Sequence, residues 1–588
     1  MTRDDIVEIL ENIALLLDIK GENPFKSRAY TNAARAVEVY SGDILAAARE
    51  ERLEGIEGIG KAIGLKLTEL ATTGKLAYYE NLRAEFPESI FELFGIPGLG
   101  PKKIKAVYDK LGVATIVELE KAAHDGRIAG LAGFGEKTAT NLIAAIEQRR
   151  KHSGYFRLGE AAPLAESILE ELRSLPDVTQ ASVAGSYRRR KEIVHDLDMI
   201  VAGRNAEAII EYFTTLPGVE TVNAKGPTKA SVVLKNGMQC DLRVVTNEEY
   251  PFAIAYFTGS KEHNVILRGR ALERGWTLNE YRLGPVESRA TGRGTQTSID
   301  ENIPKIFTER DLYQALGLDY IEPEIREGRG EVQAAESGTL PKLIELENLR
   351  GTFHNHTTAS DGRNSLADMA EAARELGLEY LGIADHSKSA FQAHGLDEKH
   401  LLAQVAEIEN LNATFEGHFR LFSGTECDIL KDGSLDFSDE ILAQLDYVVA
   451  SVHALYTPNE AEMTKRLIRV LENPNVTMLG HMTGRLLLQR EPYPVNIPAV
   501  IEAAAATGTI IELNASPWRL DMDWRWWHLA KEKGVKCSIN PDAHSTHGLQ
   551  DLWFGVAQAR KGWLERGDVV NTLPLGKIET ALKAKRSR

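Results

Sequence analysis

After residue 348 the chain alternates short apolar runs with helix-like segments, and each apolar run ends in residues that can bind metal ions. Runs such as YLGIADHS and VTMLGH alternate with segments such as SLADMAEAARELG and PAVIEAAAATG. Strands that alternate with helices favour a parallel sheet, and chemistry at the carboxyl ends of the strands is typical of a (β/α) barrel. We therefore predict a TIM-like (β/α) barrel over residues 349–588.

Histidine is concentrated in this same region, which holds eleven of the fifteen histidines. One histidine at a strand end is usually structural, but two on one strand face and further imidazoles and carboxylates at other strand ends predict a metal cluster. Such mixed ligands suit Mn²⁺ or Zn²⁺ better than Mg²⁺, and clustered metals favour hydrolysis of a phosphate ester. The predicted ligands are His354, His356, Asp361, His386, Glu426, His453, His481, Asp542 and His544.

A second carboxylate group is predicted in the middle of the chain. Asp196 and Asp198 are two residues apart in an apolar strand, so their side chains share one face, and Asp241 lies in another β-like run. Three such carboxylates repel one another unless cations lie between them, and oxygen ligands suit Mg²⁺ or Mn²⁺ held jointly with phosphates. Two ions in such a site support in-line phosphoryl transfer. The segment Gly185–Lys191 offers a hydroxyl and cationic donors to a triphosphate.

Three glycine-hydrophobic-glycine turns recur in the first 150 residues. They are Gly58-Ile59-Gly60, Gly98-Leu99-Gly100 and Gly133-Phe134-Gly135, and each opens a helix that bears lysines. Such a turn leaves backbone N–H groups free at a helix N-terminus, where they suit a phosphate oxygen of a nucleic-acid backbone. A single turn of this kind is more often a tight connection between helices. Three in tandem favour DNA binding, with contacts at Gly58, Gly60, Gly98, Gly100 and Lys102.

The overall composition excludes some classes of protein. No apolar run reaches the roughly 18 residues of a membrane span, and the three cysteines are too few and too scattered for a disulfide framework. The net charge of −16, taken alone, argues against a nucleic-acid partner. That average misleads, because six of the acidic residues are predicted metal ligands whose charge bound cations would offset, and because DNA contact needs only local positive surface. The few cysteines suit a reducing compartment, so we expect a cytoplasmic protein with no membrane partner and a monomeric state.

The aspartate pattern and the segment YFTGSKEHNVILRGRALERGWTLNEY resemble family X DNA polymerases, the group that includes DNA polymerase beta. The resemblance implies a nucleotidyltransferase α+β palm with catalytic Asp196, Asp198 and Asp241, followed by a thumb-like, nucleotide-selecting subdomain. His195 departs from polymerase beta, which has glycine just before the first aspartate. The implied nucleotide-binding residues are Ser186 and Arg189 at the β- and γ-phosphates, Tyr256 and Phe257 at the sugar, Asn264 and Arg268 at the minor groove, and Gly259.

The amino-terminal turns are similar to helix-hairpin-helix motifs, the first two more closely than the third. Lys66 follows the first turn at the spacing seen in the amino-terminal domain of family X polymerases. There a lysine forms a Schiff base with the abasic-site sugar, which requires a neutral amine. A solvated lysine on an amphipathic helix is the alternative. The resemblance therefore implies a possible abasic-sugar lyase with Lys66 as its nucleophile.

The nine predicted metal ligands resemble those of the PHP (polymerase and histidinol phosphatase) domain, which holds up to three ions. The family pattern assigns His354, His356, Glu426 and Asp542 to one ion. It assigns Asp361, His386 and His544 to a second, with Glu426 bridging to a third at His453 and His481. Thr352 departs from the aspartate common two residues before the first histidine. In bacterial family X polymerases this domain implies 3′→5′ exonuclease action and, in some, cleavage at abasic sites.

Together these features predict a multidomain α/β protein that fills short gaps in DNA repair, with gapped or nicked DNA and deoxynucleoside triphosphates as partners. Two alternatives stay open: a nuclease whose polymerase half mainly delivers DNA, and a catalytically silent DNA-end scaffold. A template-independent nucleotidyltransferase would share the three aspartates, but the helix-hairpin-helix elements, Asn264 and Arg268 favour a templated duplex. The expected parts are a helical lyase-like domain (1–85), a helix-hairpin-helix subdomain (86–153), the palm (154–252), the nucleotide-selecting subdomain (253–322), a linker (323–348) and the PHP domain (349–588).

Overall fold

The computed structural model describes residues 3–40, 44–50, 52–53, 56, 58–87, 89–94, 96, 98–151, 154–285, 303–415 and 417–586. The chain divides into two compact units, residues 1–153 and 154–588, and each is described by itself. Across the described ranges, no helix has both the length and the apolar character needed to cross a membrane.

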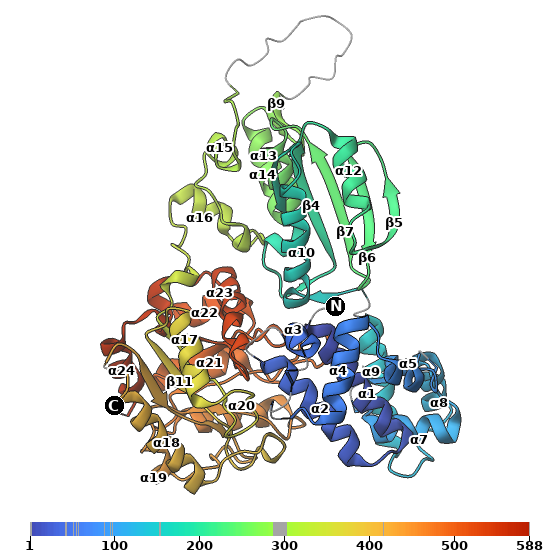
Figure 1. Ribbon diagram of the computed structural model, residues 1–588. Helices are drawn as coiled ribbons and strands as arrows, with labels where there is room; N and C mark the ends of the chain where they lie inside the picture. Colours follow the sequence, from blue (N-terminus) through green and yellow to red (C-terminus); the bar gives the residue numbers. More distant parts are fainter. Residues whose placement is uncertain are drawn as a thin grey trace, which may run out of the picture. The chain divides into compact units, whose positions relative to one another are not determined.

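The first unit is helical (Figure 1). In α1 (Arg3–Lys20) the apolar residues Ile6, Leu10, Ile13 and Leu17 recur every three or four positions, and all are buried. This face packs along α2 (Pro24–Val39), whose first turn is capped by Asn23. The unit has two apolar cores, one formed mainly within residues 6–82 and the other within 90–146. The remaining helices are α3 (Ile44–Arg49), α4 (Lys61–Thr73), α5 (Ala77–Arg83), α6 (Ile90–Phe94), α7 (Pro101–Leu111), α8 (Ile116–His124) and α9 (Glu136–Lys151).

The second unit begins with a mixed five-stranded sheet in the order β2-β4-β7-β6-β5. The second strand in this order, β4 (Asp196–Gly203), is parallel to the central strand β7 (Gln239–Val245) and antiparallel to the edge strand β2 (Val178–Val183). The sheet packs with α10 and α12 around one apolar core (Figure 1). The other elements are β1 (Phe156–Arg157), α10 (Leu158–Arg173), α11 (Gly185–Arg188), β3 (Ile193–Val194), α12 (Ala206–Thr214), β5 (Val219–Lys225) and β6 (Lys229–Leu234).

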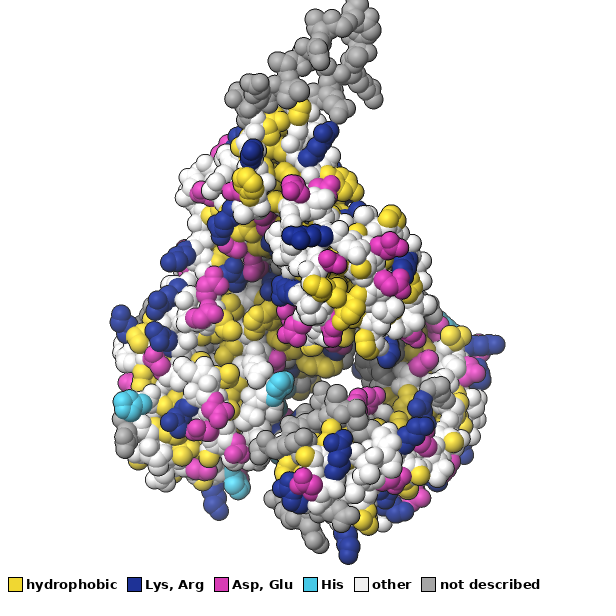
Figure 2. All heavy atoms as spheres, turned by 45° about the horizontal axis from the view of Figure 1, so that its top comes forward, with side chains coloured by type: hydrophobic (Ala, Val, Ile, Leu, Met, Phe, Trp, Pro, Cys, Tyr) yellow, Lys and Arg dark blue, Asp and Glu magenta, His cyan; other side chains and the backbone are white. Residues whose placement is uncertain are grey.

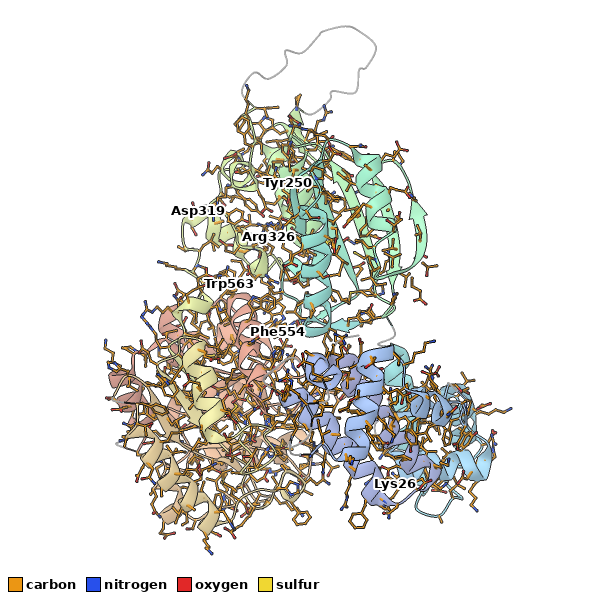
Figure 3. All side chains as sticks on the ribbon, in the orientation of Figure 1. Lys26, Tyr250, Asp319, Arg326, Phe554 and Trp563 are labelled. Carbon is orange, nitrogen blue, oxygen red and sulfur yellow. The ribbon has the colours of Figure 1, made fainter. Side chains whose placement is uncertain are left out.

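A small helical layer follows the sheet and includes the segment predicted as a linker. Within 323–348, Arg326 is fully buried and Oε1 of Glu331 lies 2.7 Å from Nδ1 of His263 on α14 (Lys261–Glu273), so this segment packs on its neighbours. Arg326 lies in the interior of this layer in Figure 3. The elements here are α13 (Tyr250–Thr258), α14 (Lys261–Glu273), β8 (Trp276–Leu278), β9 (Leu283–Pro285), α15 (Glu309–Ala315), η1 (Pro323–Ile325), α16 (Glu331–Ser337) and η2 (Leu346–Asn348).

The remainder of the second unit is a parallel barrel. One three-stranded sheet has the order β10-β11-β12 and one five-stranded sheet the order β13-β14-β15-β16-β17, all parallel. Parallel bridges between His386 and Glu426 and between Asn355 and Ala543 join the two sheets at both sides. The strands are β10 (Gly351–Thr352), β11 (Tyr380–Ile383), β12 (Arg420–Ser423), β13 (Glu426–Asp428), β14 (Val449–Ser451), β15 (Met478–Leu479), β16 (Ile510–Asn514) and β17 (Cys537–Asn540).

Helices between these strands cover the barrel, as the sequence pattern predicted. The apolar side chains of these strands are buried, and they pack with the covering helices in three apolar cores. The sequence pattern missed one strand, β16, although IIELN is an apolar run that ends in polar residues like the others. The covering elements are α17 (Leu366–Glu375), η3 (Phe391–Ala393), α18 (Glu398–Asn412), α19 (Asp439–Leu442), α20 (Glu460–Leu471), α21 (Ile497–Thr507), η4 (Trp524–Trp526), α22 (Trp527–Glu532), η5 (His547–Asp551), α23 (Leu552–Lys561), η6 (Arg566–Asp568), η7 (Val570–Thr572) and α24 (Leu575–Lys583).

Candidate active sites

The three predicted aspartates lie on neighbouring strands of the five-stranded sheet. Asp198 of β4 is the register partner of Asp241 on β7, and Asp196 is on the same face as Asp198. Burial, and after it the adjacent carboxylates of Asp196 and Asp241, together raise the pKa of Asp198 to about 7. A carboxyl group with two acidic neighbours in a largely buried position fits a site for divalent cations.

Gly185 lets the backbone approach this carboxylate cluster closely. Its φ is +60°, and a Cβ placed there would lie 2.1 Å from Oδ2 of Asp198. Any side chain at this position would therefore collide with the carboxylate. The strand-to-helix turn between β2 and α11 consequently requires glycine at residue 185.

The raised pKa of Asp198 predicts a pH-dependent effect of cations on stability. Between about pH 4 and 7 the native state holds a proton on Asp198 that the unfolded chain releases, so metal-free stability falls as pH rises through this window. A bound divalent cation favours the carboxylate and should offset this loss. We expect Mg²⁺ or Mn²⁺ to raise the melting temperature more at pH 8 than at pH 5. In thermal unfolding, Asp198→Asn should raise the metal-free melting temperature at pH 8 and reduce the further rise caused by the cation. An equal cation-induced rise at pH 5 and pH 8 in the wild type would contradict this prediction.

The predicted triphosphate-binding residues lie beside the aspartates. Ser186 lies in α11, directly after Gly185. The Arg189 side chain is largely buried, its Nε lies 3.1 Å from Glu327 Oε1, and its Nη1 donates to the carbonyl of Thr258 and packs over Gly259. Arg189 is therefore already paired with a carboxylate that a triphosphate would have to replace.

The other predicted nucleotide-binding residues lie on α13 and α14. The Tyr256 and Phe257 rings meet edge to face at 5.1 Å, and the Asn264 amide donates to the carbonyl of Tyr256 at 2.7 Å. Arg268 is exposed, and its Nε donates to the carbonyl of Asn264 at 3.3 Å. The structure thus links Asn264 and Arg268 to the aromatic pair, while their contacts with a nucleotide stay predictions.

His195, the departure noted in the sequence, faces away from the sheet interior. Its imidazole is 57% exposed, packs edge-on against Tyr155 at 5.3 Å, and lies 3.8 Å from Asp196 at its Nδ1. The β4–β7 register through Asp196 and Asp198 is regular. A bulkier residue before the first aspartate therefore leaves the strand geometry intact.

All nine predicted PHP ligands gather at the carboxyl ends of the barrel strands. Their ligand atoms form overlapping groups in which every atom lies within 4.8 Å of the others. His356 belongs to two groups and Glu426 to two, which is the sharing expected of a multinuclear centre. The groups are His356, Asp361, His386 and His544; His354, Glu426 and His481; His354, His356 and Asp542; and His386, Glu426 and His453.

The donor atoms in this cluster fit metal ligation. Nε2 of His354 and both ring nitrogens of His356 are buried and make no hydrogen bond within the described part of the chain, although carboxylates crowd around them. Burial lowers the pKa of His544, but Asp361 and Asp542 outweigh it and raise that pKa to about 9. So many facing donors without hydrogen-bond partners are typical of a site that cations fill.

Of three supporting carboxylates, Glu512 and Asp428 were missed by the sequence interpretation, whereas Asp385 ends the run YLGIADHS that it singled out. Glu512 of β16 is fully buried and lies 2.6 Å from Nδ1 of His354, and Asp428 lies 2.8 Å from Nδ1 of His453. Asp385 accepts hydrogen bonds from the Thr357 N–H and hydroxyl at 2.8 and 2.7 Å. The first two contacts fix which ring nitrogen faces the cluster, and such partners tune ligand basicity.

The cluster opens into a cavity of 660 Å³. Its lining includes most of the metal-ligand set together with Phe391, Leu455 and Arg519. Arg519 lies 3.4 Å from Asp542, and Phe391 is 87% exposed at the rim. The cavity therefore offers apolar and cationic surface beside the ligand set.

Most of the clustered tryptophans have structural positions. Trp524 is buried and donates from Nε1 to Glu192 at 3.0 Å, and the fully buried Trp527 donates to the carbonyl of Met522. The Trp518 ring covers the guanidinium of Arg157, with 3.2 Å between the ring centroid and Cζ of Arg157. These contacts hold the indole rings against neighbouring residues, which fits a role in packing.

The three amino-terminal turns share one backbone geometry. Gly58, Gly98 and Gly133 have φ values of 90°, 81° and 84°, which only glycine adopts readily. Gly60 and Gly100 are the N-caps of α4 and α7, and neither makes a side-chain capping bond. Glycine has no side chain that could occupy the N–H groups of the first helical turn. The N–H groups that can face a phosphate are therefore those of Lys61 and Ala62 in α4 and of Lys102 in α7, because Pro101 at the start of α7 has none.

Lys66 lies on α4 over two tyrosine rings. Its Nζ is 4.6 Å from the ring centroid of Tyr78 and 6.0 Å from that of Tyr30, and the two rings are stacked. Burial raises the pKa of the Tyr30 hydroxyl, so this ring stays neutral. Aromatic faces favour the charged amine, whereas attack on a sugar carbonyl needs the neutral one. The lyase role of Lys66 therefore stays a prediction.

Comparison with known families covers most of the chain. Residues 1–76 match a helix-hairpin-helix domain and 90–148 a SAM-like helix-hairpin-helix tandem. Residues 253–327 match the DNA polymerase beta thumb, and 352–516 match the PHP domain. A relative from Bacillus subtilis, called DNA polymerase/3′-5′ exonuclease PolX, is 39% identical over 99% of this chain and 100% of its own length. The chain belongs to the PolX family.

Other relatives match a smaller part of this PolX family member. A probable phosphatase of Thermoanaerobacter is 28% identical over 40% of this chain and 95% of its own length. A probable phosphatase of Clostridium acetobutylicum is 29% identical over 33% of this chain and 78% of its own length. A solved structure of Leishmania infantum polymerase beta covers 41% of this chain at 23% identity, with a TM-score of 0.26, too low for an argument. The predicted family and fold class are thus confirmed by the family models and the PolX relative.

Proposed function

We propose that this protein is a DNA-directed DNA polymerase that fills short gaps and that also removes nucleotides from 3′ ends at its PHP domain. The observation that carries this proposal is the presence of two complete ligand sets in one chain, the aspartate triad on β4 and β7 and the nine ligands of the barrel. A silent scaffold would have no need of either set.

At the palm, the aspartates would hold Mg²⁺ or Mn²⁺, and the turn at Gly185–Ser186 would hold the triphosphate. Arg189 supplies a guanidinium suited to phosphate oxygens. Tyr256 and Phe257 present aromatic edges where a sugar would lie, and Asn264 positions them through the carbonyl of Tyr256. These residues bind and orient the nucleotide, which accounts for much of the barrier in a phosphoryl transfer.

At the barrel, the imidazoles and carboxylates would hold up to three ions, with Mn²⁺ or Zn²⁺ favoured by the mixed ligands. When bound, divalent cations at both sites neutralise phosphate charge and activate an attacking oxygen. Glu512 and Asp428 orient His354 and His453 through hydrogen bonds at the opposite ring nitrogen. Arg519 beside Asp542 offers a cation to the scissile phosphate. Hydrolysis of a 3′-terminal phosphodiester fits this site, and cleavage at abasic sites is a related use of it.

DNA would be held by the amino-terminal turns at Gly58, Gly60, Gly98, Gly100 and Lys102. On the face seen in Figure 2, Lys and Arg side chains are interspersed with Asp and Glu and do not form one patch. The net charge of −16 is therefore compatible with local backbone contacts. We also propose a monomer that acts on nucleoid DNA in a bacterial cytoplasm.

Lyase activity is tested by borohydride trapping on DNA with a 5′ abasic end. If Lys66 is the nucleophile, Lys66→Ala should abolish the trapped adduct, and Lys66→Arg should do the same because guanidinium stays charged. Lys75, an exposed lysine near the end of the same helix, supplies the matched control Lys75→Ala, which should trap normally. Undiminished trapping by Lys66→Ala would remove the assignment.

The polymerase and nuclease assignments are tested together on gapped DNA with Mg²⁺ or Mn²⁺. Dependence of extension on a template strand separates this proposal from a template-independent nucleotidyltransferase. A chain that bound gapped DNA but neither extended nor shortened it would support the scaffold alternative instead.

A further inference from the structure

The palm and the barrel meet directly within the unit 154–588. A Cβ at Gly159 would lie 2.5 Å from Pro517 Cβ, and the palm core includes Phe554 of α23 at its edge. Figure 3 labels Phe554 and Trp563 where the barrel helices approach the palm and its helical layer. The segment Arg188–Lys191, which carries the predicted triphosphate-binding Arg189, lies at this contact.

Lys561, the last residue of α23, is fully buried against that segment. Its Nζ donates to the carbonyl of Arg189 at 3.0 Å, to the carbonyl of Glu324 at 3.1 Å and to Glu327 Oε1 at 2.5 Å. Burial lowers the pKa of Lys561 to about 8, and Glu327 opposes that shift. The three acceptors of the ammonium thus lie in the palm and in the last residues of the thumb match, 253–327.

Arg190 shows that this segment is held in an unfavourable conformation. Its φ is 55°, in the left-handed region that residues with a Cβ rarely adopt. Its carbonyl accepts from Nε2 of Gln558 at 2.8 Å, and its guanidinium lies over the Trp553 ring at 4.3 Å. Such a backbone persists only where its surroundings impose it, and here α23 supplies these contacts.

The same contacts govern the side chain of Arg189. Glu327 Oε1 lies between Arg189 and Lys561, and Lys191 lies 3.7 Å from its second oxygen. Because Lys561 takes much of the charge of Glu327, the carboxylate binds Arg189 less tightly than it would alone. A triphosphate can then displace Glu327 from Arg189.

We propose that Lys561 and Gln558 of the PHP domain are positioning residues for the polymerase reaction. They fix the backbone of the segment Arg188–Lys191, and Lys561 shares the charge of Glu327 so that Arg189 is available to a nucleoside triphosphate. The nuclease domain is thereby part of the polymerase's nucleotide-binding site. This inference rests on the proposed polymerase function.

The test is steady-state gap filling by the full chain, with the KM for the deoxynucleoside triphosphate and kcat measured separately. Lys561→Met should raise this KM about ten-fold and leave kcat within about two-fold, because it acts through a contact that orients the bound nucleotide. Lys561→Met combined with Glu327→Gln should recover most of the lost affinity, because both partners of the buried pair are then neutral. The matched control is Lys531→Met, a barrel lysine paired with Glu565 and Asp568, which should keep the wild-type KM.

Exonuclease activity serves as the folding control, because no residue of α23 belongs to the predicted metal ligands. If the Lys561→Met variant also loses exonuclease activity, the Gln558→Leu variant is tested in its place. Gln558→Leu removes one hydrogen bond and should raise the KM for the deoxynucleoside triphosphate about three-fold. A wild-type KM in a folded Lys561→Met or Gln558→Leu variant, with a raised KM in Arg189→Ala, would overturn this inference alone. A wild-type KM in Arg189→Ala would instead overturn the assignment of the triphosphate site.

Discussion

Asp198→Asn is expected to reduce nucleotide addition to gapped DNA by about a thousand-fold and to leave 3′→5′ exonuclease activity unchanged. Asp198 lies opposite Asp241 in the β4–β7 register and beside Asp196, so it is the carboxylate with two acidic neighbours. The asparagine side chain keeps the shape but removes the charge that would hold cations, and losses of that kind from a preorganised site are large.

The measurement is single-nucleotide insertion with saturating Mg²⁺, compared with the matched control Glu211→Gln. Glu211 is an exposed palm carboxylate that pairs with Lys225 away from the triad, so its variant should insert nucleotides like the wild type. Retained insertion in Asp198→Asn would mean that the palm site is not where nucleotides are joined.

His356→Ala is expected to reduce exonuclease activity by about a thousand-fold while gap filling continues. His356 is fully buried and belongs to two of the four ligand groups, so its loss would weaken the binding of more than one ion. The readout is shortening of a 3′-terminal strand with Mn²⁺, together with the bound metal content after dialysis. Both quantities should fall together.

The matched control for that variant is His400→Ala. His400 is an exposed barrel histidine that contacts Asp397 outside the ligand set, so its variant should keep full exonuclease activity and metal content. Full exonuclease activity in His356→Ala would remove the barrel as the nuclease site.

The sequence predicted those parts of the fold and the sites that follow local periodicity. The two-residue spacing of Asp196 and Asp198 placed them on one strand face, and polar strand ends such as His481 predicted the ligand cluster. Local patterns cannot give register between distant strands, so the alignment of Asp198 with Asp241 came only from the structure.

Contacts made by long-range packing were also beyond the sequence. Glu512 was missed because its apolar run was not counted as a strand, although it has the same pattern as the others. Residues 323–348 were predicted as a linker that packs partly on its neighbours, because the segment is charged and has few large apolar residues. The sequence did not indicate that Arg326 and Glu331 are buried by ion pairs and hydrogen bonds, because hydrophobic periodicity does not register such contacts. The contact of Lys561 with Arg189 joins residues far apart in the chain and leaves no local signal.

The most direct measurement of the central claim follows extension and shortening of one primer strand in the same gapped-DNA reaction, for the wild type, Asp196→Ala and His356→Ala. Two separate sites predict that the wild type does both, that Asp196→Ala only shortens the primer, and that His356→Ala only extends it. Loss of both activities in either folded variant, or of neither in both, would contradict the account of two active sites in one chain.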